Sequence, residues 1–424
     1  ADDSTAVGSS ALAVSTGAAN TAVGKGALDA NTTGESNVGV GAFSLSSNTT
    51  ASHGVAIGRG ALEVNTTGAN NIAIGSFALD ANTTSSHNVA IGYGALTDNT
   101  TNGRNTAVGH ETLANNTAEG NTAIGRLAMT ANTSGELNVA VGMNALDANT
   151  TASHNVAVGY DAMTQNTTGT QNVAVGSLAL DANTTASSNT AIGYNSLSAN
   201  STGANLTAVG TNSLRSNTTA NNNTAVGRSC LYTNSTGSSN TAVGADALQS
   251  NTSGSANVAI GHDTLDANTT GANNTALGYN ALGANTTADS NVAVGSGALE
   301  ASTTGSLNTA IGAGAADALT TGTTNCAMGV SALGALTTGS RNVAIGRSAI
   351  QAQTTANDNT AVGFAALENN TSGTNNTAVG RDSMEDNTTG SNNASLGTFA
   401  LEANTSASDN TALGYTAMVN NTEG

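Results

Sequence analysis

The segment Asn20–Ser36, NTAVGKGALDANTTGES, is one copy of a unit that recurs along the whole chain. Its Ala-aliphatic-Gly triplet ends at Gly24, and triplets of this kind return up to Gly414. The spacing is 17 residues in nearly all of the 25 copies and shortens to 16 in two of them. A short period sustained over 424 residues is typical of a solenoid, in which each repeat stacks on the next.

The composition of the repeat favours strands over helices. When Asn20 is numbered position 1, positions 1–5 alternate between larger and smaller side chains as a short β-strand does. Gly, Asn and Thr dominate the other positions, and all three are poor helix formers. We therefore predict an all-β fold, a parallel β-solenoid (β-roll) of 25 coils that forms one continuous domain over residues 1–424 without caps.

The size of the side chains predicts which positions face inward. Position 4 is aliphatic or Met and position 9 is mostly Leu, so we predict that both fill the core. The predicted core residues are Leu28, Leu62, Leu79, Leu96, Val23 and Ile57.

Position 3 is always small, and we predict that it points outward. A smooth column of alanines would let another chain approach closely, and the predicted contact residues are Ala22, Ala56, Ala73, Ala90 and Ala140. The alternative is that position 3 faces a turn in which larger side chains would clash.

Charge and composition exclude several kinds of partner. The net charge of −18 argues against binding to nucleic acid or to an anionic membrane. No apolar run approaches the roughly 20 residues that a spanning helix needs, so membrane insertion is not expected. Cys230 and Cys326 occupy different repeat positions and are interpreted as packing residues.

Two further columns are candidate binding surfaces. Position 10 is often acidic, and stacked carboxylates bind Ca²⁺ in other proteins, although a solvated acidic edge is the alternative. The calcium candidates are Asp29, Asp80, Asp147 and Asp181, and no other cofactor is expected. Position 6 contains most of the large side chains. It is either a binding surface for glycans or a neighbouring chain, or an exposed position at which many different side chains are accepted. The representatives of this face are Tyr93, Tyr160, Tyr194, Tyr279 and Arg59.

The recurring Asn-Thr-Thr at positions 12–14 allows two interpretations. The asparagines can form a ladder of hydrogen bonds between coils. The same residues match the N-glycosylation sequon, for which Asn31, Asn65 and Asn149 are candidates.

Catalytic motifs are not recognisable in the sequence. His53, His87 and His154 share position 17, but no nucleophile, phosphate loop or zinc-binding spacing accompanies them. We therefore expect a protein that is not an enzyme.

Three strand segments resemble a known family of surface proteins. Val55–Gly58, Val89–Gly92 and Val139–Gly142 read VAIG, VAIG and VAVG, and they are similar to the head repeats of trimeric autotransporter adhesins. Bacteriophage tail fibres contain similar repeats. The resemblance implies a left-handed roll, three chains in one rod and display on a bacterial surface. The unit here is longer than the family's usual coil, and we recognise no coiled-coil stalk, neck or membrane anchor in the sequence, so only the surface architecture is expected to carry over.

The two ends of the sequence predict head-to-tail stacking. The chain begins at Ser4–Gly8 with positions 1–5 and ends at Asn421–Gly424 with positions 12–15, so joining two copies continues the repeat with one extra residue. An excised segment of a larger fibre, or a chain that has lost its caps, is the alternative.

These observations lead us to expect a structural subunit of an extracellular or cell-surface filament that serves adhesion or matrix formation. Its expected partners are other copies of the same chain, and glycans or a host surface are further candidates. The alternatives are a discrete trimeric receptor-binding rod and an ice-binding solenoid, the latter because threonine pairs recur at positions 13 and 14. Adjacent strand residues point to opposite faces, which argues against one flat threonine array at those positions.

Overall fold

A computed structural model describes residues 3–422 of the chain. Within this range the fold is all-β, with 25 parallel strands of three residues each, about 17 residues apart, and no helix. The strands form a β-solenoid of about 24 turns, as the period of the sequence predicts. The chain divides into two compact units, Ala1–Leu206 and Thr207–Gly424, which are described separately.

The first unit contains twelve strands, each formed by positions 2–4 of its repeat. They are β1 (Thr5–Val7), β2 (Thr21–Val23), β3 (Val38–Val40), β4 (Val55–Ile57), β5 (Ile72–Ile74), β6 (Val89–Ile91), β7 (Thr106–Val108), β8 (Thr122–Ile124), β9 (Val139–Val141), β10 (Val156–Val158), β11 (Val173–Val175) and β12 (Thr190–Ile192).

The second unit contains thirteen strands. They are β13 (Thr207–Val209), β14 (Thr224–Val226), β15 (Thr241–Val243), β16 (Val258–Ile260), β17 (Thr275–Leu277), β18 (Val292–Val294), β19 (Thr309–Ile311), β20 (Cys326–Met328), β21 (Val343–Ile345), β22 (Thr360–Val362), β23 (Thr377–Val379), β24 (Ala394–Leu396) and β25 (Thr411–Leu413).

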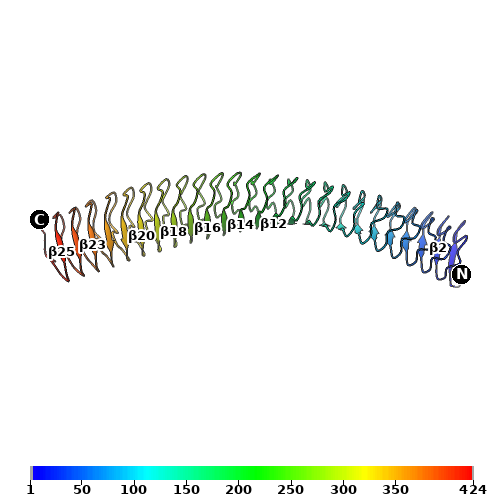
Figure 1. Cartoon of the computed structure of the whole chain (residues 1–424), viewed down its shortest axis with the longest axis horizontal. Coiled ribbons are helices and arrows are strands. Elements are labelled where there is room, and N and C mark those ends of the chain that lie inside the picture. Colours follow the sequence, from blue (N-terminus) through cyan, green and yellow to red (C-terminus); the bar gives the residue numbers. More distant parts are fainter. Residues whose placement is uncertain (1–2, 423–424) are drawn as a thin grey trace. The chain divides into compact units, whose positions relative to one another are not determined.

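Within each unit, every strand pairs in parallel with the strand of the next coil and in exact repeat register. Between β9 and β10, for example, Val139 faces Val156 and Ala140 faces Ala157. Figure 1 shows the strands of successive coils stacked along one side of the coil, with the turns on the other side. Each side chain therefore lies above its equivalent in the previous coil, and the surface of a unit consists of columns of equivalent positions.

The glycine at position 5 is required by the closeness of the coils. Gly142 has a φ of +136°, and a Cβ atom there would lie 2.3 Å from the carbonyl oxygen of Gly159 in the next coil. Both the left-handed backbone and the contact exclude any larger residue. The position is Gly in every repeat for this reason.

The interior of the coil is lined by small residues and one leucine. The position 9 residues Leu28, Leu62, Leu79 and Leu96 are fully buried, which confirms this part of the predicted core. Position 3 is buried as well, and the predicted outward column was wrong: Ala22, Ala56, Ala73, Ala90 and Ala140 have 0% exposure within their own chain.

The prediction for position 4 was wrong for the same reason, because strand residues alternate. Val23 and Ile57 point outward and are 36% and 39% exposed. The repeat that has glycine at position 3 shows why only small residues fit inside. A Cβ atom on Gly39 would already lie 3.1 Å from Ser44 Oγ and 3.4 Å from Leu28 Cγ, so the interior has room for a methyl group and little more.

Two columns of asparagines also lie inside, and their hydrogen bonds join successive coils. At position 12, Asn149 Nδ2 donates to Asn132 Oδ1 at 2.8 Å and to the Ala152 carbonyl at 3.1 Å. At position 1, the Asn155 backbone N–H donates to Asn138 Oδ1 at 2.9 Å. The predicted asparagine ladder is thus confirmed at position 12, and position 1 adds a second ladder that the sequence analysis did not anticipate.

The junction predicted between the last and the first repeat includes residues 1–2 and 423–424, which lie outside the described residues.

Candidate functional site

The outward side chains at positions 2 and 4 form the most regular surface of each unit, which we call the strand face. Position 2 is Thr, Val, Ile, Cys or Ala, and position 4 is Val, Ile, Leu or Met, so no strand places a charged residue on this face. Most position 4 residues remain more than a third exposed or close to it, including Ile124 at 41% and Ile192 at 39%. Each unit therefore presents a neutral, mainly apolar ladder to its surroundings.

Of the two free cysteines, one lies in the interior of the coil and the other on the strand face. Cys230 is buried at position 8, and burial raises the pKa of its thiol to about 12. Cys326 lies on the strand face at position 2 of β20 and is half-buried, and burial also raises the pKa of its thiol. Both observations agree with the interpretation of the cysteines as packing residues.

The predicted aromatic column at position 6 is exposed. Tyr93, Tyr160, Tyr194 and Tyr279 are 47–59% exposed, and Arg59 is also exposed. They do not form one continuous patch, since Tyr160 and Tyr194 lie two coils apart.

Only some of these residues have aromatic neighbours. The Tyr93 ring stacks on His110 at 5.3 Å and meets Phe77 edge-on at 6.1 Å, while Arg59 lies 5.5 Å from the Phe77 ring centroid. The structure therefore assembles one mixed cluster in the first unit, from Arg59 to His110.

The acidic column at position 10 lies at the edge of the interior. Burial raises the pKa of the carboxyl groups of Asp80, Asp147 and Asp181 above their usual range, and Asp29 is half-buried in the same column. Asp147 and Asp181 are separated by a coil that has Thr164 at this position. The column does not bring the four calcium candidates together, and Ca²⁺ binding there stays a prediction.

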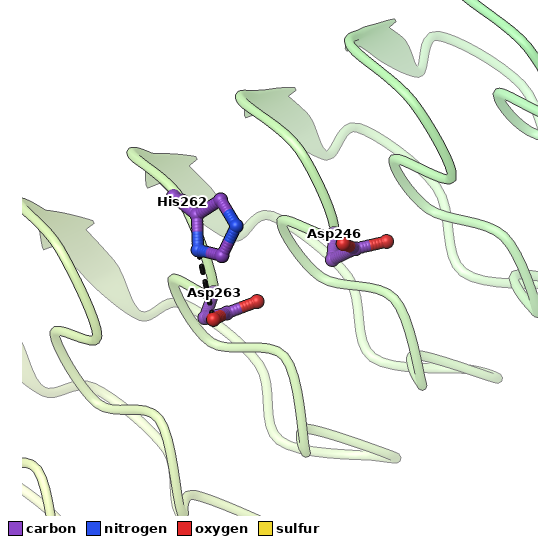
Figure 2. Close-up of side chains that lie close together, drawn as sticks. All are labelled: Asp246, His262 and Asp263. Atoms are coloured by element: carbon purple, nitrogen blue, oxygen red, sulfur yellow. Dashed lines mark ion pairs between the residues drawn. The ribbon is translucent and has the colours of Figure 1, made fainter.

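Within residues 3–422, one group of three side chains has the spacing of a metal site, and it contains none of the four candidates. It consists of Asp246, His262 and Asp263, whose nearest ligand atoms all lie within 4.8 Å of one another. His262 Nδ1 is 2.8 Å from Asp263 Oδ2, and Asp246 approaches from the preceding coil (Figure 2). One imidazole and two carboxylates suit Zn²⁺, but the guanidinium of Arg228 is already paired with Asp246.

The sequence analysis missed this cluster because its members occupy variable positions. Asp246 and Asp263 are both at position 7, one repeat apart, and His262 precedes Asp263 at position 6. Comparing variable positions between neighbouring coils, rather than along one repeat, is the signal that finds it.

The glycosylation prediction was wrong for the folded chain. Asn31, Asn65 and Asn149 have exposures of 0%, 1% and 0%, and their Nδ2 atoms donate hydrogen bonds inside the coil. A glycan requires an accessible Nδ2 atom, which the ladder at position 12 does not leave.

The threonines at position 13 are also engaged between coils. Thr133 Oγ1 donates to the Thr150 carbonyl at 2.9 Å, and Thr167 Oγ1 donates to the Thr184 carbonyl at 3.0 Å. Their hydroxyl groups therefore serve the stacking of the coils, which weakens the idea of an ice-binding array at positions 13 and 14.

Comparison with models of known protein families and with curated protein sequences gave no match for this chain. The resemblance to adhesin head repeats stays a prediction from the strand motifs. The described residues contain no helix of the length and hydropathy that a membrane span requires.

Proposed function

We propose that this chain is a non-enzymatic structural subunit of an extracellular or cell-surface fibre, and that its copies associate side by side through the strand face. The observation that carries the proposal is the neutral ladder at positions 2 and 4. The chain has 27 acidic and only nine basic residues, so two copies repel each other over most surfaces. The strand face has no charged residue, and copies can approach there without that repulsion.

The repetition of the face favours tight association. Full burial of a Val or Ile side chain stabilises by about 1.5–3 kcal/mol, and each coil still exposes a part of this area. The loss of translational and rotational freedom costs about 4–15 kcal/mol, but only once for each association event. Because the gain grows with the number of coils and the cost does not, a long solenoid associates more strongly than a short one.

Stacking of subunits head to tail is a second part of the proposal. A parallel ladder leaves unpaired N–H and C=O groups on its outermost strand, and such an edge accepts a further strand. Side-by-side and end-to-end contacts together would produce a fibre.

Sedimentation and electron microscopy of the purified chain test the proposal. We expect assemblies larger than a monomer, and we expect Val156→Lys with Val173→Lys to shift them toward monomers, because a charge is then buried in two neighbouring coils of the contact. The matched control is Thr151→Lys with Thr168→Lys, which adds the same charge to exposed position 14 in neighbouring coils. A wild-type chain that stays monomeric at micromolar concentration overturns the proposal, and discrete trimers without filaments favour the receptor-binding rod.

The strand face also favours ice binding as the second candidate. Its Thr, Val and Ile side chains repeat at about 4.8 Å between coils and about 6.6 Å along each strand, which is a regular two-dimensional lattice. Positions 2 and 4 share one face, so the objection to positions 13 and 14 does not apply to them. Thermal hysteresis in a monomeric preparation, lost in Val156→Lys with Val173→Lys, would support this function instead.

A further inference from the structure

A cavity opens on the turn side of the first unit, where Gly94 occupies position 7. Its volume is about 430 Å³, and it lies between Phe77 of the preceding coil and Glu111 of the following coil. All three residues have a left-handed backbone, with φ values of 60°, 59° and 52°. The missing side chain of Gly94 therefore contributes to the cavity, and the backbone follows the same path as in the neighbouring coils.

At two other glycines of position 7 an aromatic ring covers the gap, whereas at Gly297 and Gly314 no ring does. A Cβ atom on Gly60 would lie 3.2 Å from the ring of Phe77, and one on Gly26 would lie 3.1 Å from the ring of Phe43. A Cβ atom on Gly94 would meet only Thr97 Oγ1 at 3.3 Å and Glu111 Cγ at 3.5 Å. No aromatic ring covers Gly94 in this way.

One wall of the cavity is aromatic and held in place. Tyr93 is 50% exposed and lines the cavity together with Phe77. The stacked ring of His110 and the edge-on ring of Phe77 support Tyr93 from two directions. A ring that is fixed before the ligand arrives loses little conformational entropy on binding.

The remaining walls carry three carboxyl groups and no basic side chain. Asp80, Asp98 and Glu111 line the cavity, and Arg59, at the far end of the aromatic cluster, does not. Asp80 Oδ1 is buried and makes no hydrogen bond. Burial, together with the charges of Glu63 and Asp98, raises the pKa of the Asp80 carboxyl, although backbone hydrogen bonds oppose this shift. The cavity is thus lined by three carboxyl groups and by no Lys or Arg side chain, while His110 Nδ1 lies 3.7 Å from Glu111 Oε2.

We propose that this cavity binds a small organic cation of the quaternary ammonium type. Carboxylates attract the charge, and an aromatic ring attracts an alkylated cation through its negative face. An anion is repelled by the three carboxyl groups, and a neutral ligand can donate hydrogen bonds to them but lacks the attraction between opposite charges. A simple metal cation gains nothing from the Tyr93–Phe77 wall.

The second unit contains a natural comparison. A cavity of about 640 Å³ there is lined by Asp266, Glu300 and Asp317, with Gly283 and Gly334 at position 10 leaving the space open. No aromatic residue lines it. Acidic charge without an aromatic wall should not select an alkylated cation.

Titration of the full chain with choline, followed by calorimetry and by ligand-observed NMR, tests the proposal. We expect saturable binding of one choline that excess Na⁺ at constant ionic strength does not abolish. Dimethylbutanol, the uncharged analogue in which carbon replaces nitrogen, should bind at least about tenfold more weakly.

Three variants locate the site. Gly94→Asn should weaken binding because its side chain occupies part of the cavity beside Tyr93, and it should fold because Asn144, Asn195 and Asn280 occupy position 7 with φ values of 54–57°. Tyr93→Leu should weaken binding about five- to tenfold through loss of the cation–π contact. Tyr194→Leu removes an exposed tyrosine from the same column outside the cavity and should bind as the wild type does.

Three results overturn the proposal: no saturable binding by the wild type, equal binding by Gly94→Asn, or equal binding of dimethylbutanol. The proposal does not depend on the assembly of fibres, since the lysine variants of the strand face leave this cavity unchanged and should bind choline equally well.

Discussion

The interior columns and the strand face are built from the same three-residue strands, but they follow opposite rules. Inside, position 3 is alanine in nearly every coil and has no exposure in most of them, although alanine is smaller and less apolar than its neighbours. Outside, positions 2 and 4 carry the β-branched residues that most proteins bury. The difference teaches that available space, rather than hydrophobicity, decides which side of a thin coil a residue occupies.

The largest effect on stability should come from truncating an apolar side chain to alanine in the interior, and the same truncation on the strand face should have a much smaller effect. Leu180→Ala, in the interior, should lower the free energy of unfolding by about 2–5 kcal/mol, because it removes a fully buried side chain. Val175→Ala, on the strand face of the same coil, should cost less than about 1 kcal/mol, since Val175 is 36% exposed. Denaturant unfolding followed by circular dichroism measures both. Equal losses would mean that the strand face is already buried in an assembly.

The next effect concerns the asparagine ladder at position 12. Asn166→Ala should cost about 1–3 kcal/mol, because it removes donors to Asn149 and Gly169 and an acceptor for Asn183. Asn166→Leu should cost less, since Leu319 and Leu336 are fully buried at this position in other coils. Thr168→Ala, at exposed position 14, is the control that should leave stability unchanged. If Asn166→Leu lowered the free energy of unfolding more than Asn166→Ala does, the coil around Asn166 would not accommodate a leucine as the coils of Leu319 and Leu336 do.

A smaller effect follows from the half-buried carboxyl groups. The pKa of Asp80 and Asp181 is raised in the folded chain, so the folded state binds these protons more tightly than the unfolded chain does. Their stabilising contribution is present below the unfolded pKa of about 3.9 and is lost as the pH rises through the folded pKa.

Asp181→Asn should therefore gain a few tenths of a kcal/mol at neutral pH relative to the wild type, after screening by solvent is considered. This gain should shrink on acidification. Asp358 is the control of opposite sign, because its hydrogen bond to Arg341 lowers its pKa and Asp358→Asn removes a stabilising pair. Unfolding curves recorded at neutral pH and near pH 4 compare the variants, and a gain that grows on acidification would contradict the assignment.

The last comparison should leave stability unchanged and concerns thiol reactivity. Cys230 has a pKa of about 12, so its thiolate is scarce at pH 8 and a maleimide should not label it in the folded chain. Cys326, on the strand face, should react faster, and its rate should keep rising with pH because its pKa is also raised. Mass spectrometry of the labelled peptides measures both rates. Association through the strand face should slow Cys326 alone, and the lysine variants should restore its rate.

The sequence by itself determined the period, the parallel register and the absence of a large core. A glycine at every position 5 and a step of 17 residues leave stacked coils as the only regular arrangement. The leucines at position 9 and the asparagine ladder at position 12 could also be predicted. Each recurs at one position in most copies, so each side chain lies next to its equivalent in the preceding and the following coil.

Only the tertiary structure decided which side of the strand faces inward and which variable side chains meet. Alternation is symmetric, so Ala22 and Val23 are equally good candidates for the core until the width of the coil is known. The metal-like cluster of Asp246, His262 and Asp263 and the cavity at Gly94 arise between coils, at positions that differ from repeat to repeat. The consensus sequence of the repeat does not predict such neighbours, because the stacking of coils, and not adjacency in the sequence, brings these side chains together.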